Sequence, residues 1–215
     1  GPHQRIRTTS AAAFALTDVQ SPVTAAIEVT TTASLPTTPG LPDDIFHTDG
    51  QITEQPIRAL TLCALAPRKG AMLWDIGAGS GSISVEWCLQ GGRAIALETR
   101  PDRLANITAN IAKFALQDRM QTRHAHITAG TLPADLPPPD AVFIGGGADQ
   151  SLLETLFKAL PKGTRLVMNA VTLETETIVQ NWHAQKGGTL MRIDIANATP
   201  LGRMRGWTPL RPVTQ

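Results

Sequence analysis

The sequence of 215 residues contains no tyrosine, two cysteines and no hydrophobic run long enough to cross a membrane. Cys63 and Cys88 form no Cys-x-x-Cys or metal-ligand spacing. Each lies in an apolar stretch, so we expect buried free thiols in a reducing compartment and no metal site. The N-terminus also lacks the charged and apolar regions of a secretory signal. These absences predict a cytoplasmic protein with no membrane partner.

The sequence also has no large excess of positive or negative charge. The chain has 19 Lys and Arg against 18 Asp and Glu, which gives a formal net charge of +1. Bulk electrostatics therefore give no reason to expect a nucleic acid or an anionic membrane as partner. Any site for anions has to be formed locally. The length suits one α/β domain with an extension.

What the sequence does have is a run of three alternating glycines in residues 73–82 (LWDIGAGSGS). The apolar start predicts a strand, the glycines a tight turn, and the following residues a helix. Gly77, Gly79 and Gly81 can adopt positive φ and let a ligand lie on the backbone, next to the free N–H groups of the helix. The alternative is a tight strand-to-helix connection without a ligand.

The spacing of these glycines selects between cofactors. A dinucleotide fingerprint needs glycine where Ser82 stands. The pattern present is acidic-x-G-x-G-x-G, with Asp75 at the acidic position, and it resembles motif I of class I S-adenosylmethionine-dependent methyltransferases. The next predicted strand, residues 93–97, ends on Glu98, where doubly wound folds carry an acidic side chain that binds ribose hydroxyls. A solvated glutamate at a strand end is the alternative.

From residue 43 onward, predicted helices alternate with predicted strands. Strands are expected near residues 71–76, 93–97, 120–127, 140–144, 165–169 and 190–195, and the Pro- and Gly-rich segment after Thr199 is expected to be a loop and a final antiparallel strand. This rhythm predicts an α/β fold with a mostly parallel sheet and helices on both faces. Together with motif I, it implies the Rossmann-like class I methyltransferase fold with seven strands.

The N-terminal part has a different composition. Residues 30–42 are rich in Thr and Pro and predict an interdomain linker. Residues 1–29 begin with Gly-Pro-His, typical of a tag remnant, followed by a helical pattern at 10–16 and a strand-like pattern at 23–29. We expect them to be the end of a preceding domain, with a disordered extension as the alternative. Residues 43–215 form the expected methyltransferase domain.

Several motifs together resemble one family, the decarboxylating precorrin methyltransferases of cobalamin (vitamin B12) biosynthesis. Besides residues 73–82, the resemblance is carried by residues 46–53 (FHTDGQIT), 139–147 (PDAVFIGGG), 169–174 (NAVTLE) and 200–202 (PLG). It implies S-adenosylmethionine as cofactor, S-adenosylhomocysteine as product, a precorrin tetrapyrrole as substrate, methylation at C15 and decarboxylation of the C12 acetate. It also implies a homotetramer.

The resemblance extends to the N-terminal residues. Residues 5–29 are similar to the tail of the tetrapyrrole methylase domain that precedes this one in bifunctional members of the family. The implied partner is therefore an N-terminal C5-methyltransferase domain of the same full-length chain.

The resemblance also implies a set of cofactor-binding residues. The motif I turn would wrap the methionine and ribose, Glu98 would hold the ribose, Thr53 would contact the cofactor, and Ala129 would meet the adenine through its backbone. Many related sequences carry Gly-Asp before that alanine, where this chain has Ile127-Thr128. The expected set is Thr53, Asp75, Gly77, Ala78, Gly79, Ser80, Gly81, Glu98 and Ala129.

A precorrin carries many carboxylates, so we expect arginines in the substrate site. Of the arginines near the C-terminus we select Arg203 and Arg205, although arginines in a Gly/Pro-rich loop are often only solvated. Asn169, Thr172 and Glu174 follow the fifth strand at the edge where ligands bind in such folds. Glu174 either binds a pyrrole N–H or only charges the first turn of its helix. No catalytic residue is predicted, because methyl transfer mainly requires alignment and exclusion of water.

Two other functions are compatible with these patterns. One is an S-adenosylmethionine-dependent methyltransferase for another small molecule, RNA or protein. The Asn/Asp-Pro-Pro-Tyr/Phe signature of amino-group methylation is absent, because residues 145–147 are glycines and the chain lacks tyrosine. The other is a non-catalytic binding module, against which the intact motif I with Glu98 argues.

Overall fold

The computed structural model describes residues 5–30 and 34–215. The chain divides into two compact units, Gly1–Ser34 and Leu35–Gln215. In the first unit the described residues form one short 3-10 helix, Ala11–Ala13, and no strand at 23–29, so the predicted strand there is wrong. The expected tag remnant, residues 1–3, lies outside the described residues.

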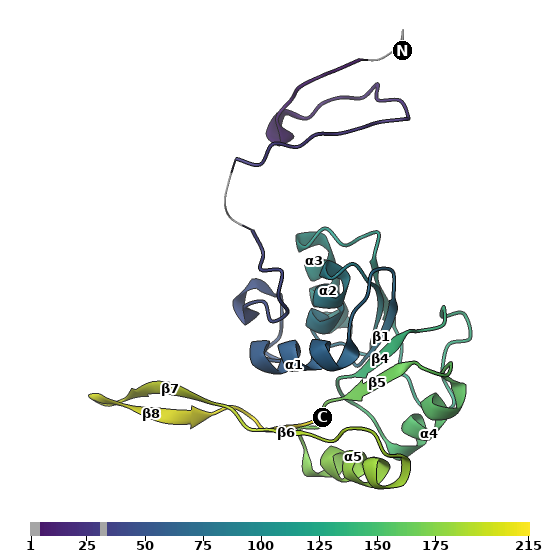
Figure 1. Cartoon of the computed structure of the whole chain (residues 1–215), viewed down its shortest axis with the longest axis vertical. Coiled ribbons are helices and arrows are strands. Elements are labelled where there is room, and N and C mark those ends of the chain that lie inside the picture. The colour runs from purple at the N-terminus through teal and green to yellow at the C-terminus, as the bar shows by residue number, and fades with distance from the viewer. Residues whose placement is uncertain (1–4, 31–33) are drawn as a thin grey trace. The chain divides into compact units, whose positions relative to one another are not determined.

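The second unit is built on a parallel sheet (Figure 1). In the described chain it has five strands in the order β3-β2-β1-β4-β5. Their bounds are Met72–Ile76 for β1, Arg93–Glu98 for β2, Met120–His124 for β3, Ala141–Ile144 for β4 and Arg165–Met168 for β5. The order reverses between β1 and β4, as in doubly wound folds.

Within residues 34–215, the sheet has five strands in place of the predicted seven, and the difference lies at the edge formed by β5. β9, Val213–Thr214, reaches the sheet only through one bridge between Ala170 and Thr214, and β6, Arg192–Ile193, pairs antiparallel with β9. The ladder stops at five strands because β5 ends at Met168, which leaves one residue pair to join the last two strands.

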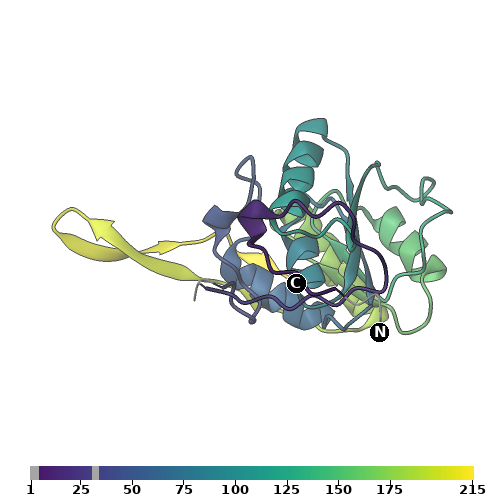
Figure 2. The same ribbon diagram turned by 90° about the horizontal axis from the view of Figure 1, so that it is seen from above.

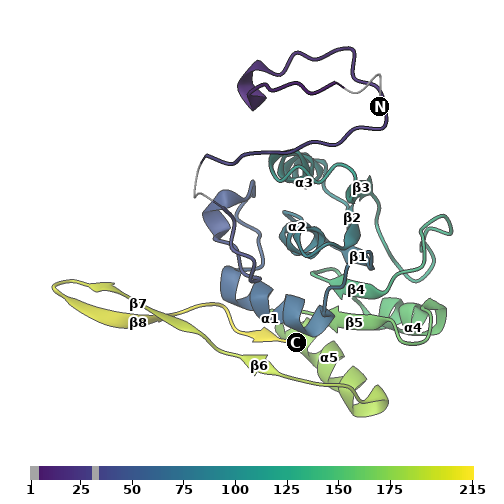
Figure 3. The same ribbon diagram turned by 45° about the horizontal axis from the view of Figure 1, so that its top comes forward.

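Helices cover both faces of the sheet (Figure 3). The short helix η2, Asp43–Ile45, precedes α1, Gln55–Leu65; α2 is Ser82–Leu89, α3 is Pro101–Lys113, α4 is Gln150–Ala159 and α5 is Leu173–Lys186. Helices α1, α2 and α3 pack on one apolar cluster that includes Leu62, Trp87 and Ile107. Helices α4 and α5 pack on a second cluster, around Leu152 and Leu156. Among the described residues, no helix is long and apolar enough to cross a membrane.

The segment predicted as a loop after Thr199 is a β-hairpin instead. β7, Ala196–Leu201, pairs antiparallel with β8, Met204–Pro209, over six residue pairs. Gly202, with φ +59°, opens its two-residue turn. Prolines are tolerated because both strands of a two-stranded ribbon are edge strands. The hairpin projects away from the rest of its unit (Figures 1 and 2) and exposes Leu201, Met204 and Trp207.

The end of the predicted linker is part of the folded unit. The buried carboxylate of Glu86 accepts hydrogen bonds from the N–H groups of Gly40 (2.6 Å) and Leu41 (2.9 Å). Arg58, also buried, donates to the same carboxylate at 2.5 Å and to the carbonyl of Leu41. The unit therefore starts before the expected boundary at residue 43. Cys88 is buried as predicted, whereas Cys63 is exposed.

Candidate active site

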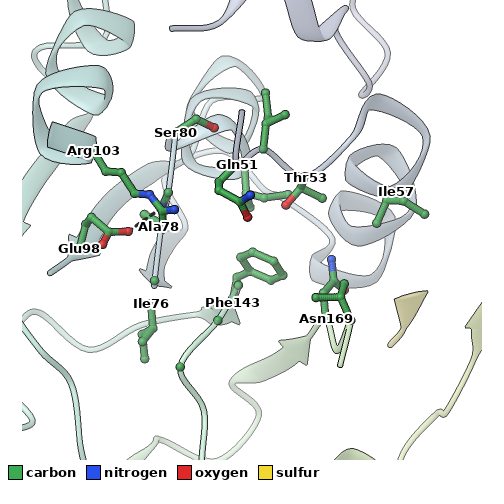
Figure 4. Close-up of a pocket in the computed structure, with 18 of the residues that line it drawn as sticks. Gln51, Thr53, Ile57, Ile76, Ala78, Ser80, Glu98, Arg103, Phe143 and Asn169 are labelled. Carbon is green, nitrogen blue, oxygen red and sulfur yellow. Dashed lines mark hydrogen bonds between the residues drawn. The ribbon is translucent and has the colours of Figure 1, made fainter. Parts of the chain in front are cut away.

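A cavity of about 740 Å³ lies at the carboxyl ends of the parallel strands (Figure 4). Its walls come from the turns after β1 and β4, from the end of β2, from the segment before α1 and from residues 209–213. Ligands in open α/β sheets bind at this edge, where the strand order reverses. The volume falls within the range of roughly 300–1,000 Å³ that is typical of small-molecule sites.

The glycine turns after β1 and β4 pack backbone against backbone. Gly77 has φ +70°, and its N–H donates to the carbonyl of Leu97 at 2.9 Å. A Cβ added to Gly77 would lie 2.8 Å from the carbonyl oxygen of Gly146, and one on Gly145 would lie 3.0 Å from that of Gly77. No larger residue fits this contact without moving the backbone. The glycine run that follows β4 thus belongs to the same construction as motif I.

Glu98 closes the glycine turn from the neighbouring strand. One carboxylate oxygen, Oε2, accepts the N–H of Gly79 at 2.9 Å. The other, Oε1, accepts the N–H groups of Thr99 (2.8 Å) and Arg100 (3.0 Å) and the hydroxyl of Thr99. The side chain is buried yet lines the cavity. Its orientation is therefore fixed, and Oε2 has a free lone pair for a ligand hydroxyl.

Two motif I residues lie behind the turn rather than on the cavity wall. Asp75 is buried and accepts a hydrogen bond from the Ser84 hydroxyl at 2.7 Å, while its Oδ1 has no partner among the described residues. Burial, with a smaller contribution from the Glu98 charge, raises its pKa to about 7. Gly81 caps α2, and a Cβ there would meet the side chains of Met120 and Ile107 at 3.0 and 3.2 Å.

The segment before α1 is held over the turn by Asn110 of α3. The fully buried Asn110 amide accepts the N–H of His47 (2.8 Å) and donates to the carbonyls of His47 and Ser80, both at 2.9 Å. One side chain thus connects the segment to motif I. Further along it, Gln51 and Thr53 line the cavity, and Arg58 holds the carbonyl of Thr53.

The predicted site residues divide into two groups according to whether they line the cavity. Those that line the cavity are Thr53, Gly77, Ala78, Gly79, Ser80, Glu98 and Asn169. Those outside its lining are Asp75, Gly81, Ala129, Thr172, Glu174, Arg203 and Arg205. Residues 125–127 line the cavity, whereas Ala129 does not, and β3 ends at His124, earlier than predicted.

The predicted substrate residues that miss the cavity have other structural roles. Thr172 caps α5, with a reciprocal hydrogen bond to Thr175. Glu174 lies exposed in the first turn of α5, and its own backbone N–H, then the Thr172 hydroxyl, lowers its pKa. This agrees with the helix-charging alternative. Arg203 lies in the hairpin turn and Arg205 in β8, because the segment expected to be a loop forms two hydrogen-bonded antiparallel strands.

Two arginines that were not selected do line the cavity. Arg103, in the first turn of α3, donates through Nε to Asp49 at 3.0 Å, and this hydrogen bond lowers the pKa of Asp49. Its position just after Pro101, at the carboxyl end of β2, is a signal that could have identified it. Arg211 lies between β8 and β9. Only its place among the C-terminal arginines pointed to it.

Comparison with known proteins settles the family. The model of the precorrin methyltransferase domain matches residues 44–215, most of the chain. The chain belongs to the precorrin methyltransferase domain family. The family expected from the motifs is therefore confirmed, and so is the fold. More distant methyltransferase structures, under 25% identical, share the fold alone.

This chain matches different shares of the length of individual relatives in this family. A precorrin-6Y C(5,15)-methyltransferase [decarboxylating] from Sinorhizobium sp is 46% identical over 224 residues, covering 100% of this chain and 53% of the relative. The chain thus spans about half the length of that curated relative. A protein from Pyrobaculum calidifontis, named as a probable cobalt-precorrin-6B C(15)-methyltransferase (decarboxylating), is 31% identical over 188 residues, covering 82% of this chain and 93% of the relative.

A solved structure gives the same assignment. It is the C-terminal domain of precorrin-6Y C5,15-methyltransferase from Rhodobacter capsulatus, with 57% identity and a TM-score of 0.78. The match covers 84% of this chain and 97% of that chain.

Proposed function

We propose that this precorrin methyltransferase domain transfers a methyl group from S-adenosylmethionine to C15 of a precorrin and removes carbon dioxide from the C12 acetate side chain. The observation that carries the proposal is the cavity, in which the motif I turn and Glu98 lie opposite a second wall formed by the segment before α1 and residues 209–213. A Pyrobaculum relative that this chain covers almost completely bears the name of the C15 reaction alone.

The residues present fit S-adenosylmethionine. Gly77 and Gly79 leave the turn free of side chains, and Glu98 offers an acceptor for a ribose hydroxyl. Thr53 and Ser80 line the same cavity, and Ala125, His126 and Ile127 lie where an adenine would follow the ribose. When bound, this cofactor supplies the methyl group as a sulfonium.

The residues of the chain contribute alignment and exclusion of water. Methyl transfer is an in-line displacement, in which a carbon–sulfur bond breaks as a carbon–carbon bond forms. Ile76, Leu97 and Phe143 line the cavity, are buried and exclude water from it. For decarboxylation, the side-chain carbon–carbon bond breaks, carbon dioxide leaves, and the electron pair of that bond enters the conjugated macrocycle, where it replaces the pair used to form the bond to the transferred methyl group. We therefore assign no general base to the domain.

The proposal extends to the larger protein. We infer that residues 5–29 are the tail of a tetrapyrrole methylase domain, joined through residues 30–42, and that this domain methylates C5. The homotetramer stays a prediction, as does the cytoplasmic location, for which two free cysteines in place of a disulfide are supporting evidence.

The test is mass analysis of the product. The protein is incubated with S-adenosylmethionine and a C5-methylated precorrin, with Glu98→Gln as the matched variant. We expect a product one methyl heavier and one carbon dioxide lighter, formed more slowly by the variant because its cofactor affinity is reduced. If the tetrapyrrole returns unchanged while the cofactor binds in a separate titration, the proposed substrate is wrong and another methyl acceptor has to be sought.

A further inference from the structure

The cavity contains two arginines in the described part of the chain, and they differ in what surrounds them. Arg103 already has a carboxylate partner, Asp49, at 3.0 Å. Arg211 also lines the cavity and is exposed, and among residues 5–30 and 34–215 no carboxylate lies within ion-pairing distance of it. The charge of Arg211 is therefore available to a ligand, whereas that of Arg103 is compensated by the protein.

Arg211 is held in place by the chain on both sides of it. On one side the N–H of Leu210 donates to the carbonyl of Ile195 at 2.8 Å. On the other, Thr214 and Ala170 exchange backbone hydrogen bonds of 2.9 and 2.8 Å. Pro209 and Pro212 flank the segment and fix its φ angles. Arg211 is thus carried by a stiff strand connection rather than by a free tail.

The final residue strengthens this attachment. The Gln215 side chain donates to Asn169 Oδ1 at 2.9 Å and to the Thr61 hydroxyl at 3.1 Å. Because Asn169 lines the cavity, the C-terminal segment is attached directly to its wall. This places residues 209–213 at the Asn169 end.

That end of the cavity is apolar and lies away from the glycine turn. Ile57 and Val213 pack in one buried cluster and both line the cavity. Figure 4 shows Ile57 and Asn169 on the opposite side from Glu98, Ala78 and Arg103. Because Arg211 is exposed, its guanidinium gains apolar surroundings only when a bound ligand covers it, and its pairing with a carboxylate is then stronger than in water.

We propose that Arg211 anchors a peripheral carboxylate of the tetrapyrrole, and that this carboxylate is retained in the product. The inference rests on the proposed function, which supplies a substrate with many carboxylates. The reason for retention is electronic. Decarboxylation moves the negative charge from the carboxylate into the macrocycle, so an arginine paired with that carboxylate would stabilise the starting state more than the transition state and slow the step.

The test compares Arg211→Gln with Arg203→Gln and Arg205→Gln. The two controls remove the same charge a few residues away, on the hairpin and outside the cavity. For Arg211→Gln we expect KM for the tetrapyrrole to rise about ten- to hundredfold, as for loss of a hydrogen-bonded charge pair. We expect kcat within about twofold, an unchanged Kd for S-adenosylmethionine and the usual ratio of carbon dioxide released to methyl transferred. Arg211→Lys should recover part of the affinity.

Two results of this kinetic comparison would overturn the inference. If KM for Arg211→Gln equals that of the hairpin controls, Arg211 does not bind substrate. If instead methylated product accumulates without loss of carbon dioxide, Arg211 acts on the departing carboxylate.

Equilibrium binding of the tetrapyrrole, followed by its absorbance, separates this inference from the proposed reaction. Binding that depends on Arg211 without turnover keeps the anchor and refutes the reaction. Absence of binding to the unaltered protein refutes both. A tetrapyrrole with esterified carboxylates should bind the unaltered protein and Arg211→Gln equally.

Discussion

The two sides of the cavity are built in different ways. On one side the turns after β1 and β4 meet through backbone atoms, so close that a single Cβ on Gly77 would lie 2.8 Å from a carbonyl oxygen. On the other side, the segment before α1 and residues 209–213 are held by side chains such as Asn110 and Gln215. The first side is fixed by the sheet itself, and the second by a few polar contacts between distant parts of the sequence.

We propose that this difference separates cofactor from substrate. A wall made of glycine backbone can change only by rebuilding two strands, which suits a cofactor that does not vary. A wall made of side chains on short segments can change one residue at a time, which suits the recognition of a particular tetrapyrrole. The two walls should therefore respond differently to substitution.

The largest effect is expected from Gly77→Ala, which breaks the backbone wall. We expect a loss of about 2–5 kcal/mol in the free energy of unfolding, because left-handed backbone costs alanine about 1–2 kcal/mol and overpacking adds about 1–3. Thermal and denaturant unfolding measure it, together with the Kd for S-adenosylmethionine. The control is Gly130→Ala, where a Cβ meets nothing within 4 Å. Equal stability of the two variants would contradict the close contact.

The next effect tests the side-chain wall. Asn110→Ala leaves the N–H and C=O of His47 and the C=O of Ser80 without their partner. We expect about 2–3 kcal/mol of destabilisation, since each unsatisfied buried group costs about 1–3 kcal/mol with partial relief by water. The Kd for S-adenosylmethionine should rise as the segment before α1 moves.

Asn106→Ala, one turn earlier on α3, serves as the matched control, because Asn106 has no side-chain hydrogen bond among the described residues. Asn110→Asp keeps the acceptor for His47 N–H and loses both donations. Because its second oxygen would face the carbonyls of His47 and Ser80 in a buried site, Asn110→Asp should lower cofactor affinity at least as much as Asn110→Ala. An affinity equal to that of the control would show that Asn110 only fills space.

The smallest effect concerns Asp75, beneath the backbone wall, and depends on pH. Its pKa is raised from 3.8 to about 7, so the folded state binds this proton more tightly than the unfolded chain. Stability therefore falls as pH rises through that range. Asp75→Asn cannot ionise. As pH rises from about 4 to 7.5, its free energy of unfolding should therefore increase by roughly 1–3 kcal/mol relative to that of the unaltered protein.

Denaturant unfolding at several pH values gives this difference directly, with the exposed Asp118→Asn as control. A difference that does not change with pH would mean that Asp75 is ionised throughout. The Ser84 hydrogen bond can persist in Asp75→Asn, because the amide oxygen also accepts.

The same contrast explains what the sequence could and could not predict. Gly77, Glu98 and Asn169 reach the cavity because each ends or directly follows a parallel strand, and the carboxyl ends of such strands share one edge. Arg203 and Arg205 were misplaced because a six-pair ladder removes them from that edge. The turn glycine Gly202 between two β-compatible runs was the available signal for a hairpin.

Other misses have no local signal at all. Asp75 has the motif spacing, but whether it faces a ligand or Ser84 depends on how α2 packs. The contacts of Asn110 with His47 span 63 residues. The side-chain wall is assembled from such distant pairs, and pattern reasoning cannot place them.

The guanidinium of Arg58 joins the end of the linker to the cavity. It donates to the carbonyl of Leu41, which is buried at the end of the predicted linker, and to that of Thr53 on the cavity wall. Its partner Glu86 holds Gly40 and Leu41 by their N–H groups. A displacement of Leu41 would therefore be transmitted through Arg58 to Thr53 on the side-chain wall of the cavity. The start of the folded unit and the cavity wall thus depend on the same buried side chain.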